Sequence, residues 1–484
     1  MTEGRTSNSW LRLAVPLLAA ALLAACDIGP DMKQPVVAEP PAWRESAAQS
    51  AAWPSADWWQ GFGSAELDGL IAEAQQANYD LGAAVARIRE ADAQARVAGA
   101  ALLPTVDAGG SVSRQRELFP LGPQGQTITY NEYQVGLTAS YEIDFWGKNR
   151  AALNAAKATA LASRYDQQVV ALTVVTAVAT SYFQFIGLED RLKVARENLA
   201  TAEDVLRVIE GRRQVGTAMD LDVSQQQTVV ASLRAAIPPL EQQLSQTLDA
   251  VAILVGRAPE QVTIAEASLY DLSLPAVAPG LPSELLARRP DIAEAEAQLV
   301  SANANIKVAR AQFYPSVDLT ASGGFASLAL RSLFTGPGAV WSVAGSFTQP
   351  IFEGGRLKGQ LEFTKARYDE LVQNYRKAVL YAFGNVEDAL AAIRRTGEQQ
   401  AAQEQTVAEA RRSLEIARSR YQIGLTDLLT VLNTENALFP AEDTLVQVRL
   451  AHMQALVSLF NALGGGWQAP TGSGFSAAAA REKS

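Results

Sequence analysis

Apolar side chains recur every three or four positions over two long segments, which is the spacing of one face of a helix. In the first segment they are Leu188, Leu192, Ala195, Leu199, Ala202, Leu206 and Ile209. In the second they are Val407, Ala410, Leu414, Ala417 and Tyr421. Steps of three and four form a heptad seam, so we expect long helices that pack as coiled coils. Between Lys148 and Arg213 only Gly187 and Gly211 weaken the pattern, which allows about 63 helical residues, or roughly 95 Å.

Four shorter segments alternate between apolar and polar residues, and we predict strands over about 104–115, 131–144, 315–327 and 339–350. Each is about ten residues long, the length that a tilted strand needs to cross a bilayer. Aromatic residues stand near the strand ends, at Tyr130, Tyr133, Tyr141, Phe145 and Trp146. The alternative is two water-soluble hairpins that pack their apolar faces on the helices.

The same order of patterns occurs twice along the chain. Three landmarks recur at offsets of 211, 207 and 208 residues, namely Pro104 and Pro315, Gly147 and Gly354, and Gly216 and Gly424. We therefore predict a tandem duplication, with one repeat over 64–255 and the other over 283–467. Residues 256–282 are predicted to form a linker or small irregular segment, and residues 468–484 a C-terminal tail.

The N-terminus has the features of an export signal. Arg5 and Arg12 precede an apolar stretch that ends Leu23-Ala24-Ala25-Cys26, which is similar to a bacterial lipobox. We predict a lipoprotein signal peptide over 1–25, lipidation of Cys26, and a tail over 26–63. The alternative is an ordinary secretory peptide with a chance cysteine. Asp27 conflicts with outer-membrane sorting, because in enteric bacteria an aspartate there usually retains a lipoprotein at the inner membrane.

Composition narrows the function classes. The chain has 51 Asp and Glu against 41 Lys and Arg, a net charge of -10, and no Lys/Arg-rich run. Nucleic acid is therefore an unfavourable partner, since phosphate binding needs clustered cations. His452 and Cys26 are the only residues of their types, too few for a Cys/His metal site, a histidine-based triad or a disulfide framework. We predict no cofactor and no metal, and we interpret His452 as a packed or solvated residue.

Four strands cannot close a barrel, and open sheet edges are not tolerated in lipid. We therefore expect the chain to oligomerise, and three copies would give twelve strands around a lumen. The polar strand faces carry acidic charges at Asp107, Glu142, Asp144 and Asp318. Acidic rings favour cations. The alternative is that these carboxylates are paired near the base of the barrel.

Ordered motifs over nearly the whole mature chain resemble those of a known family. They are Arg288-Arg289-Pro290-Asp291-Ile292, Phe313-Tyr314-Pro315-Ser316, Ile351-Phe352-Glu353-Gly354-Gly355-Arg356, Arg420-Tyr421-Gln422-Ile423-Gly424 and Ala462-Leu463-Gly464-Gly465-Gly466-Trp467. Together with the lipobox, they resemble the TolC-like outer membrane efflux proteins, in the lipoprotein group that includes OprM and NodT.

This resemblance implies a mainly α fold with a membrane β-barrel, closed as a 12-stranded barrel in a homotrimer and continued by a helical tunnel through the periplasm. It implies the exit channel of a tripartite efflux pump. The implied partners are a periplasmic adaptor (membrane fusion) protein, an inner-membrane transporter of the RND type, and outer-membrane lipid.

The resemblance also locates a gate. Gly216 and Gly424 match the turns at the periplasmic tip that contact the adaptor. The residues that match the closing constriction and a link between neighbouring helices are Asp222, Tyr421, Leu429, Thr430 and Asn433. Family members often have aspartate where Asn433 stands, so closure is expected to depend more on Leu429 and on a hydrogen bond between Asp222 and Tyr421.

Two other functions compete with an export channel. A lipid-anchored coiled-coil scaffold could space two membranes without conducting ions, but it would not need a polar strand face. A lipoprotein enzyme would need a convergent set of titrating groups, which the lone His452 does not supply.

Overall fold

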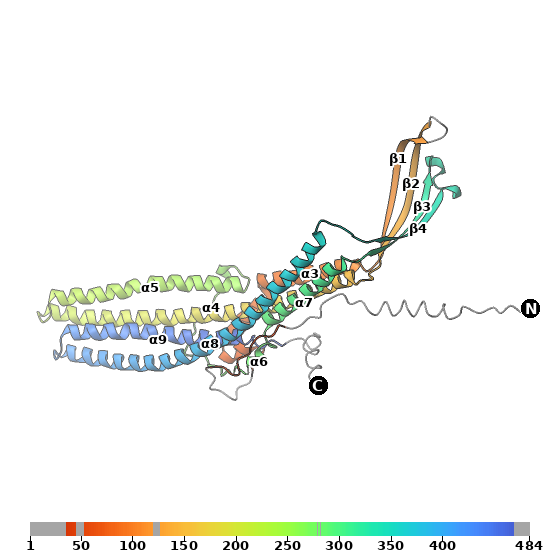
Figure 1. Cartoon of the computed structure of the whole chain (residues 1–484). Coiled ribbons are helices and arrows are strands. Elements are labelled where there is room, and N and C mark those ends of the chain that lie inside the picture. Colours follow the sequence, from red (N-terminus) through yellow and green to blue (C-terminus); the bar gives the residue numbers. More distant parts are fainter. Residues whose placement is uncertain (1–34, 45–52, 120–125, 278, 281, 469–484) are drawn as a thin grey trace, which may run out of the picture. The chain divides into compact units, whose positions relative to one another are not determined.

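The structure, a computed structural model, describes residues 35–44, 53–119, 126–277, 279–280 and 282–468. These residues are mainly helical and include a four-stranded antiparallel sheet (Figure 1). The predicted combination of long helices with four strands is therefore confirmed. The predicted signal peptide and Cys26 lie outside the described residues, as does the chain after residue 468.

The chain divides into two compact units. The strand unit contains Arg87–Ser163 and Ala295–Tyr375, and the bundle unit contains Val36–Ala86, Arg164–Glu294 and the described part of Arg376–Ser484. Each unit therefore draws on both halves of the chain.

The two halves share one order of main elements, namely a 22-residue helix, two strands, a 67-residue helix and a 35-residue helix. The first half runs through η1 (Trp58–Phe62), α2 (Ala65–Ala77), α3 (Tyr79–Ala100), β1 (Thr105–Phe119), β2 (Gln126–Glu142), α4 (Lys148–Gln214) and α5 (Asp220–Leu254). The second, after η2 (Pro259–Gln261) and α6 (Pro282–Leu285), runs through α7 (Pro290–Ala311), β3 (Ser316–Ser327), η3 (Leu330–Ser332), η4 (Gly336–Gly338), β4 (Ala339–Thr348), α8 (Arg356–Gln422) and α9 (Leu428–Ala462). Helices α4 and α8 have 67 residues each, and α5 and α9 have 35 each.

The sheet has the order β1-β2-β3-β4, and its register places apolar residues beside apolar residues. Leu137 on β2 pairs with Gly323 on β3, which pairs with Trp341 on β4. Paired residues share a face of a sheet, so the apolar positions of the four strands form one continuous face. That face is uncovered in the strand unit, because Leu137 is 56% and Trp341 81% exposed. The four strands therefore do not pack their apolar face on the helices of the strand unit.

The strand bounds differ from the predicted ones most at the hairpin of β1 and β2. β1 continues to Phe119, beyond the predicted end at 115, and β2 begins at Gln126 rather than at 131. The alternation of apolar and polar residues stops near Ser113. The pairing of β1 with β2 continues to Phe119, because backbone hydrogen bonds hold the two strands together. β2 also ends at Glu142, so Asp144 lies in the turn before α4.

Aromatic side chains form the first core of the bundle unit. Trp58 of η1 stacks on Phe460 of α9 with 4.5 Å between ring centroids, and Phe62 packs on Phe183 of α4 at 4.8 Å. The described N-terminal segment is fixed to the same unit, since Nε1 of Trp43 donates to the carbonyl of Gly280 at 2.9 Å.

Helix α4 contains an apolar window long enough to cross a membrane, and it is the one described helix that does. Half of that window is buried inside the structure. Val178, Phe183 and Ile186 of α4 all lie in the aromatic core. The apolar stretch therefore serves packing within the bundle unit.

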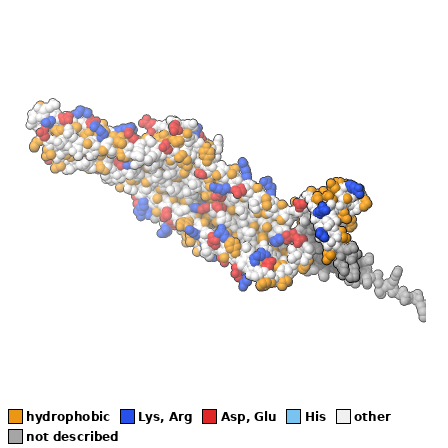
Figure 2. Space-filling model, turned by 90° about the horizontal axis from the view of Figure 1, so that it is seen from above, with side chains coloured by type: hydrophobic (Ala, Val, Ile, Leu, Met, Phe, Trp, Pro, Cys, Tyr) orange, Lys and Arg blue, Asp and Glu red, His pale blue; other side chains and the backbone are white. Residues whose placement is uncertain are grey.

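A second core joins the segments of α4, α5, α8 and α9 that precede and follow the two helix turns. Its side chains include Ile209, Val230, Leu414 and Val431, one from each helix. These four helices lie side by side in Figure 1. On the face drawn in Figure 2, basic side chains are interspersed with acidic ones along the helices. Such a mixed surface gives no electrostatic footprint for a polyanion on that face.

Candidate channel and gate

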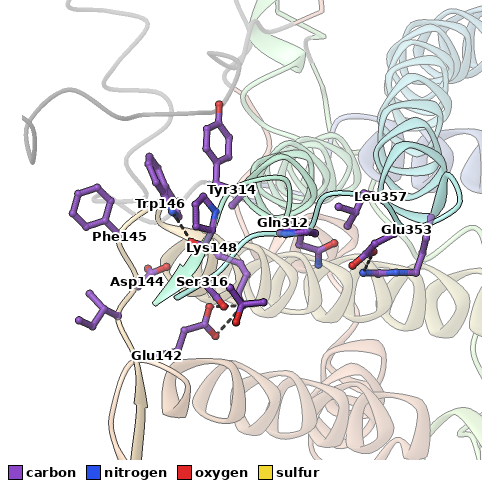
Figure 3. A pocket seen from close by; sticks show the side chains of 16 residues that line it. Glu142, Asp144, Phe145, Trp146, Lys148, Gln312, Tyr314, Ser316, Glu353 and Leu357 are labelled. Atoms are coloured by element: carbon purple, nitrogen blue, oxygen red, sulfur yellow. Dashed lines mark hydrogen bonds and ion pairs between the residues drawn. The ribbon is translucent and has the colours of Figure 1, made fainter. Parts of the chain in front are cut away.

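Charged residues surround a cavity of about 320 Å³ at the junction of the strands with α4 and α8 (Figure 3). Nζ of Lys148 donates to both oxygens of Glu142, at 2.6 and 2.9 Å. Glu353 forms an ion pair with Arg356. The carboxylates in this cavity are therefore largely neutralised, which is the alternative considered above for the barrel base.

Asp144, one of the predicted lumen charges, caps the start of α4. Its Oδ1 accepts from the backbone N–H of Asn149 at 2.9 Å, and Oδ2 accepts from that of Arg150 at 2.8 Å. Side-chain oxygens commonly satisfy the free N–H groups at a helix start. The Arg150 guanidinium also contacts the Asp144 carboxylate at 3.2 Å.

Asp318 and Asp107 remain on the polar face of the sheet. Asp318 pairs with Glu142 in the strand register and accepts a hydrogen bond from the Ser316 hydroxyl at 3.1 Å. Asp107 lies on β1 and is exposed. Neither carboxylate has a basic partner among the described residues. Two of the four predicted lumen charges therefore keep an unpaired negative charge.

Aromatic rings gather where the strands end. Trp146 stacks on Tyr314 with 4.8 Å between centroids, and its Nε1 donates to the carbonyl of Pro315 at 2.8 Å. Phe145 meets the Trp146 ring edge to face at 5.0 Å. Aromatic residues with a polar tip favour the interface between membrane and water, so this cluster suits the lower edge of a membrane-spanning sheet.

The two predicted tip turns have the same hydrogen bonds. After α4, the N–H of Thr217 donates to the carbonyl of Arg212 at 2.8 Å, and Gly216 has φ 74°. After α8, the N–H of Leu425 donates to the carbonyl of Arg420 at 2.8 Å, and Gly424 has φ 78°. This is the Schellman motif, in which a left-handed glycine ends a helix. Glycine is needed because a side chain disfavours positive φ.

The three predicted constriction residues lie on one exposed face at the start of α9. Leu429, Thr430 and Asn433 are all exposed, and the Leu429 side chain is 58% exposed. Thr430 is held by Asp427, whose carboxylate accepts from its N–H at 3.0 Å and its hydroxyl at 2.6 Å. These bonds lower the pKa of Asp427. The face therefore lies outside the core of the bundle unit, with Thr430 fixed by Asp427.

Asp222 and Tyr421 share no hydrogen bond among the described residues of the single chain, and the expected link stays a prediction. Asp222 instead accepts from the backbone N–H of Met219 at 2.8 Å and caps its own helix. Tyr421 is buried beneath Arg212, whose guanidinium lies 4.5 Å from the ring centroid and donates to the Tyr421 carbonyl at 2.7 Å. Burial raises the pKa of the Tyr421 phenol, and Arg212 opposes that shift. Beside the tip turns, Arg212 of α4 links the first hairpin to Tyr421 of the second.

Except for Leu429, the exposed apolar side chains beside both tip turns were not predicted. They are Val215, Met219 and Leu221 on the first hairpin and Ile423, Leu425 and Leu429 on the second. Each is at least 58% exposed. For Val215, Ile423 and Leu425, the signal in the sequence is an apolar residue directly beside a turn glycine, where polar residues are usual.

A buried polar pair near the tip was also missed. Glu435 on α9 and Gln226 on α5 are both 0% exposed, and burial raises the pKa of Glu435 from 4.5 to about 7. The signal lies in the heptad spacing, because Glu435 follows Leu428 by one heptad and Gln226 precedes Val230 by four residues. Each therefore occupies a position that packing reserves for an apolar residue.

Titrating groups elsewhere do not form a catalytic or metal site in the described residues. No group of three or more His, Cys, Asp and Glu side chains there could hold a metal ion. Nδ1 of His452 lies 2.8 Å from the Thr396 hydroxyl, and burial lowers its pKa. In the described structure, His452 is a packed residue between α8 and α9.

Four strands with one apolar and one polar face, joined to helical hairpins that end in glycine turns, define a class of membrane channel with a long helical extension. The chain belongs to the outer membrane efflux protein family, whose model matches residues 70–257 and 281–465. It is an outer-membrane efflux channel that extends into the periplasm, and it is not an enzyme. The family assignment excludes a non-conducting scaffold.

Relatives and solved structures agree with this assignment. The chain is 43% identical to the pyoverdine export outer membrane protein OpmQ of Pseudomonas aeruginosa, over 93% of this chain and 96% of that protein. It is 34% identical to the cation efflux system protein CusC of Escherichia coli, over 94% of this chain and 98% of that protein. The open state of the Neisseria gonorrhoeae MtrE outer membrane channel superposes with a TM-score of 0.83 at 30% identity, covering 92% of this chain and 99% of that one.

Proposed function

We propose that three copies of the chain close a twelve-stranded barrel and form the exit duct of a tripartite efflux pump. The observation that supports this is the open sheet: the outer sides of its edge strands β1 and β4 are unpaired among the described residues, and its apolar face is exposed. In lipid, each unpaired backbone group costs several kcal/mol, so the edges must pair with other copies. A three-fold arrangement pairs β1 of one protomer with β4 of the next.

Cross-linking tests this closure. In the variant that combines Ser111→Cys on β1 with Ser342→Cys on β4, a short thiol cross-linker should give covalent dimers and trimers in outer-membrane vesicles. Each single variant is the matched control and should give no ladder, because a three-fold ring never brings two β1 strands together. A cross-linked product that stops at the dimer, or a monomer in mild detergent, would contradict the trimer.

We further propose that the tip turns at Gly216 and Gly424 contact a periplasmic adaptor, which joins the channel to an inner-membrane transporter, of the RND type by family resemblance. The exposed apolar residues beside the turns support this, since exposed apolar patches are typical of interaction sites. Val215→Asp with Leu425→Asp should abolish efflux in cells but leave the conductance of the purified channel unchanged. Ile253→Asp, at another exposed apolar site at the other end of α5, is the control and should keep efflux.

Lipidation of Cys26 is proposed as a second anchor beside the barrel. Two acyl signals hold a protein on a membrane stably, since each buried methylene contributes about 0.8 kcal/mol. Mass spectrometry of the mature protein should find an acylated N-terminal Cys26 in the outer-membrane fraction. An unmodified Cys26, or the inner-membrane location that Asp27 suggests, would contradict this part of the proposal.

The cargo is proposed to be selected by the transporter and adaptor rather than by the channel. OpmQ is named for pyoverdine export, CusC for cation efflux and TtgF of Pseudomonas putida for toluene efflux, although all three are at least 34% identical to this chain. Channels this similar with cargoes this different support a duct of low selectivity.

A further inference from the structure

A polar pair joins the two helical hairpins of the bundle unit through side chains that water does not reach. Nε2 of Gln226 on α5 donates to Oε2 of Glu435 on α9 at 3.2 Å and to the carbonyl of Ala202 on α4 at 3.0 Å. Both side chains are 0% exposed, and apolar side chains from all four helices surround them.

Each member of the pair keeps one oxygen without a hydrogen-bond partner. These atoms are Oε1 of Gln226 and Oε1 of Glu435. An ionised carboxylate and an amide oxygen are both acceptors, so they cannot satisfy one another. A proton taken from water onto Oε1 of Glu435 turns that oxygen into a donor. The neutral acid can then bond to Oε1 of Gln226 and complete a doubly hydrogen-bonded acid–amide pair.

The charged groups around the pair do not replace that proton. Arg418 on α8 favours the ionised carboxylate electrostatically, but it does not contact Glu435. Glu203 of α4 and Arg234 of α5 bond to each other at 2.7 Å, and Arg411 of α8 bonds to Glu442 of α9 at 2.5 Å. The Asp222 carboxylate of α5 accepts a hydrogen bond from the Met219 N–H. Gln226 is therefore the group that forms a direct hydrogen bond with Glu435.

We propose that Gln226 and Glu435 form a proton-held latch that keeps the two hairpins together at the tip and so couples opening of the channel to pH. When Glu435 is neutral, the pair is satisfied and α5 stays bound to α9. When Glu435 ionises, a buried anion with one unpartnered oxygen remains, and conformations that admit water between α5 and α9 are favoured. Opening should therefore increase as the pH rises.

This inference rests on the proposed function, because it assumes that separation of the hairpins opens the duct. The pair is distinct from the constriction residues, which are exposed on another face of α9, whereas Glu435 faces the core. Glu435 acts through helix position and does not line the passage.

Resting conductance of the full-length protein in planar bilayers without adaptor tests the latch. For the unmodified protein we expect the open probability to rise about tenfold between about pH 6 and pH 8, because a group with a pKa of about 7 goes from roughly one tenth to roughly nine tenths ionised over that range. Glu435→Gln is uncharged at every pH and keeps a donor toward Gln226, so its pH slope should be flat. Glu409→Gln removes an exposed carboxylate of α8 and is the matched control, which should keep the full slope.

A second variant keeps the test decisive if Glu435→Gln does not fold. Gln226→Leu with Glu435→Leu fills the core with apolar side chains, and it should stay closed at all pH values tested. Infrared difference spectra between the unmodified protein and Glu435→Gln should also show a protonated carboxylic acid that disappears as the pH rises.

The outcomes separate the latch from the proposed channel. Conduction with the same pH slope in the unmodified protein, Glu435→Gln and the double leucine variant overturns the latch and leaves the channel standing. Absence of the acid band at low pH also overturns the latch. If no variant conducts at any pH while cross-linking shows intact trimers, the proposed duct fails and the latch fails with it.

Discussion

The guanidinium of Arg212 covers the ring of Tyr421 at 4.5 Å and donates a hydrogen bond to the Tyr421 backbone carbonyl at 2.7 Å. Arg212 lies in the last turn of α4 and Tyr421 in the last turn of α8. One side chain thus fastens the end of the first hairpin to the end of the second. A cation near the end of a helix also interacts favourably with its free carbonyls.

Arg212→Met should loosen the tip and raise resting conductance. The variant keeps much of the apolar stem but loses the cation–π contact and the hydrogen bond, together worth about 1 to 3 kcal/mol per protomer. Arg213→Met is the matched control, since Arg213 pairs with Asp220 within its own hairpin at 2.5 Å. Tyr421→Phe should also be nearly silent, because the link uses the ring and the backbone. Equal conductance in Arg212→Met and Arg213→Met would show that this contact does not hold the gate.

Gly424→Ala should destabilise the protein by about 1 to 2 kcal/mol, because alanine disfavours the left-handed conformation that Gly424 adopts. Gly384→Ala in α8 gives the opposite sign, since that glycine is helical, exposed and has open space around its Cβ position. There the change should stabilise by about 0.5 to 1 kcal/mol. Chemical unfolding of both purified variants measures the difference, and a stabilised Gly424→Ala would contradict the turn geometry.

Stability of the bundle unit should fall as the pH rises through neutrality. The pKa of Glu435 is raised in the folded state from 4.5 to about 7. Its contribution is therefore fully present below about pH 4.5 and is lost as the pH rises through 7, by roughly 2 to 4 kcal/mol per protomer. Thermal unfolding between pH 5 and 8 should show this loss, and Glu435→Gln should remove it.

His452 acts on stability in the opposite direction. Its pKa is lowered by burial, so its contribution is present above the unfolded value of 6.5 and is lost as the pH falls. His452→Asn separates the two groups, because it leaves the loss above neutrality in place. A loss above neutrality that disappears in His452→Asn would show that Glu435 is not its source.

Asp107 and Asp318 should set the ion preference of the lumen. Asp107→Asn with Asp318→Asn should reduce cation preference in reversal potentials under a KCl gradient, because these carboxylates lack basic partners. Glu142→Gln with Lys148→Gln removes a paired couple, keeps the net charge and should change the preference little. Anion preference in the unmodified protein would contradict the acidic lumen.

Local rules predicted much of this fold because its elements are long and regular. Helix α4 has 67 residues where the spacing allows about 63, and the alternation predicts the face of each strand. The role of Asp144 was not readable, since a carboxylate two residues after a strand follows the same alternation whether it faces the lumen or caps a helix. Arg212 with Tyr421, and Gln226 with Glu435, depend on which helices lie side by side. The spacing marks such residues as core positions but does not name their partners.

The equal lengths of the paired helices restrict how the two halves of the chain can change. One residue inserted into α8 alone would move its turn by about 1.5 Å and rotate it by about 100° relative to the turn of α4. Such a slip would separate Arg212 from Tyr421 and turn the exposed apolar residues of one hairpin away from those of the other. The strands face no such restriction, and β1 and β2 have 15 and 17 residues where β3 and β4 have 12 and 10. Insertions can therefore accumulate at the strand hairpins, while the helices can lengthen or shorten only together.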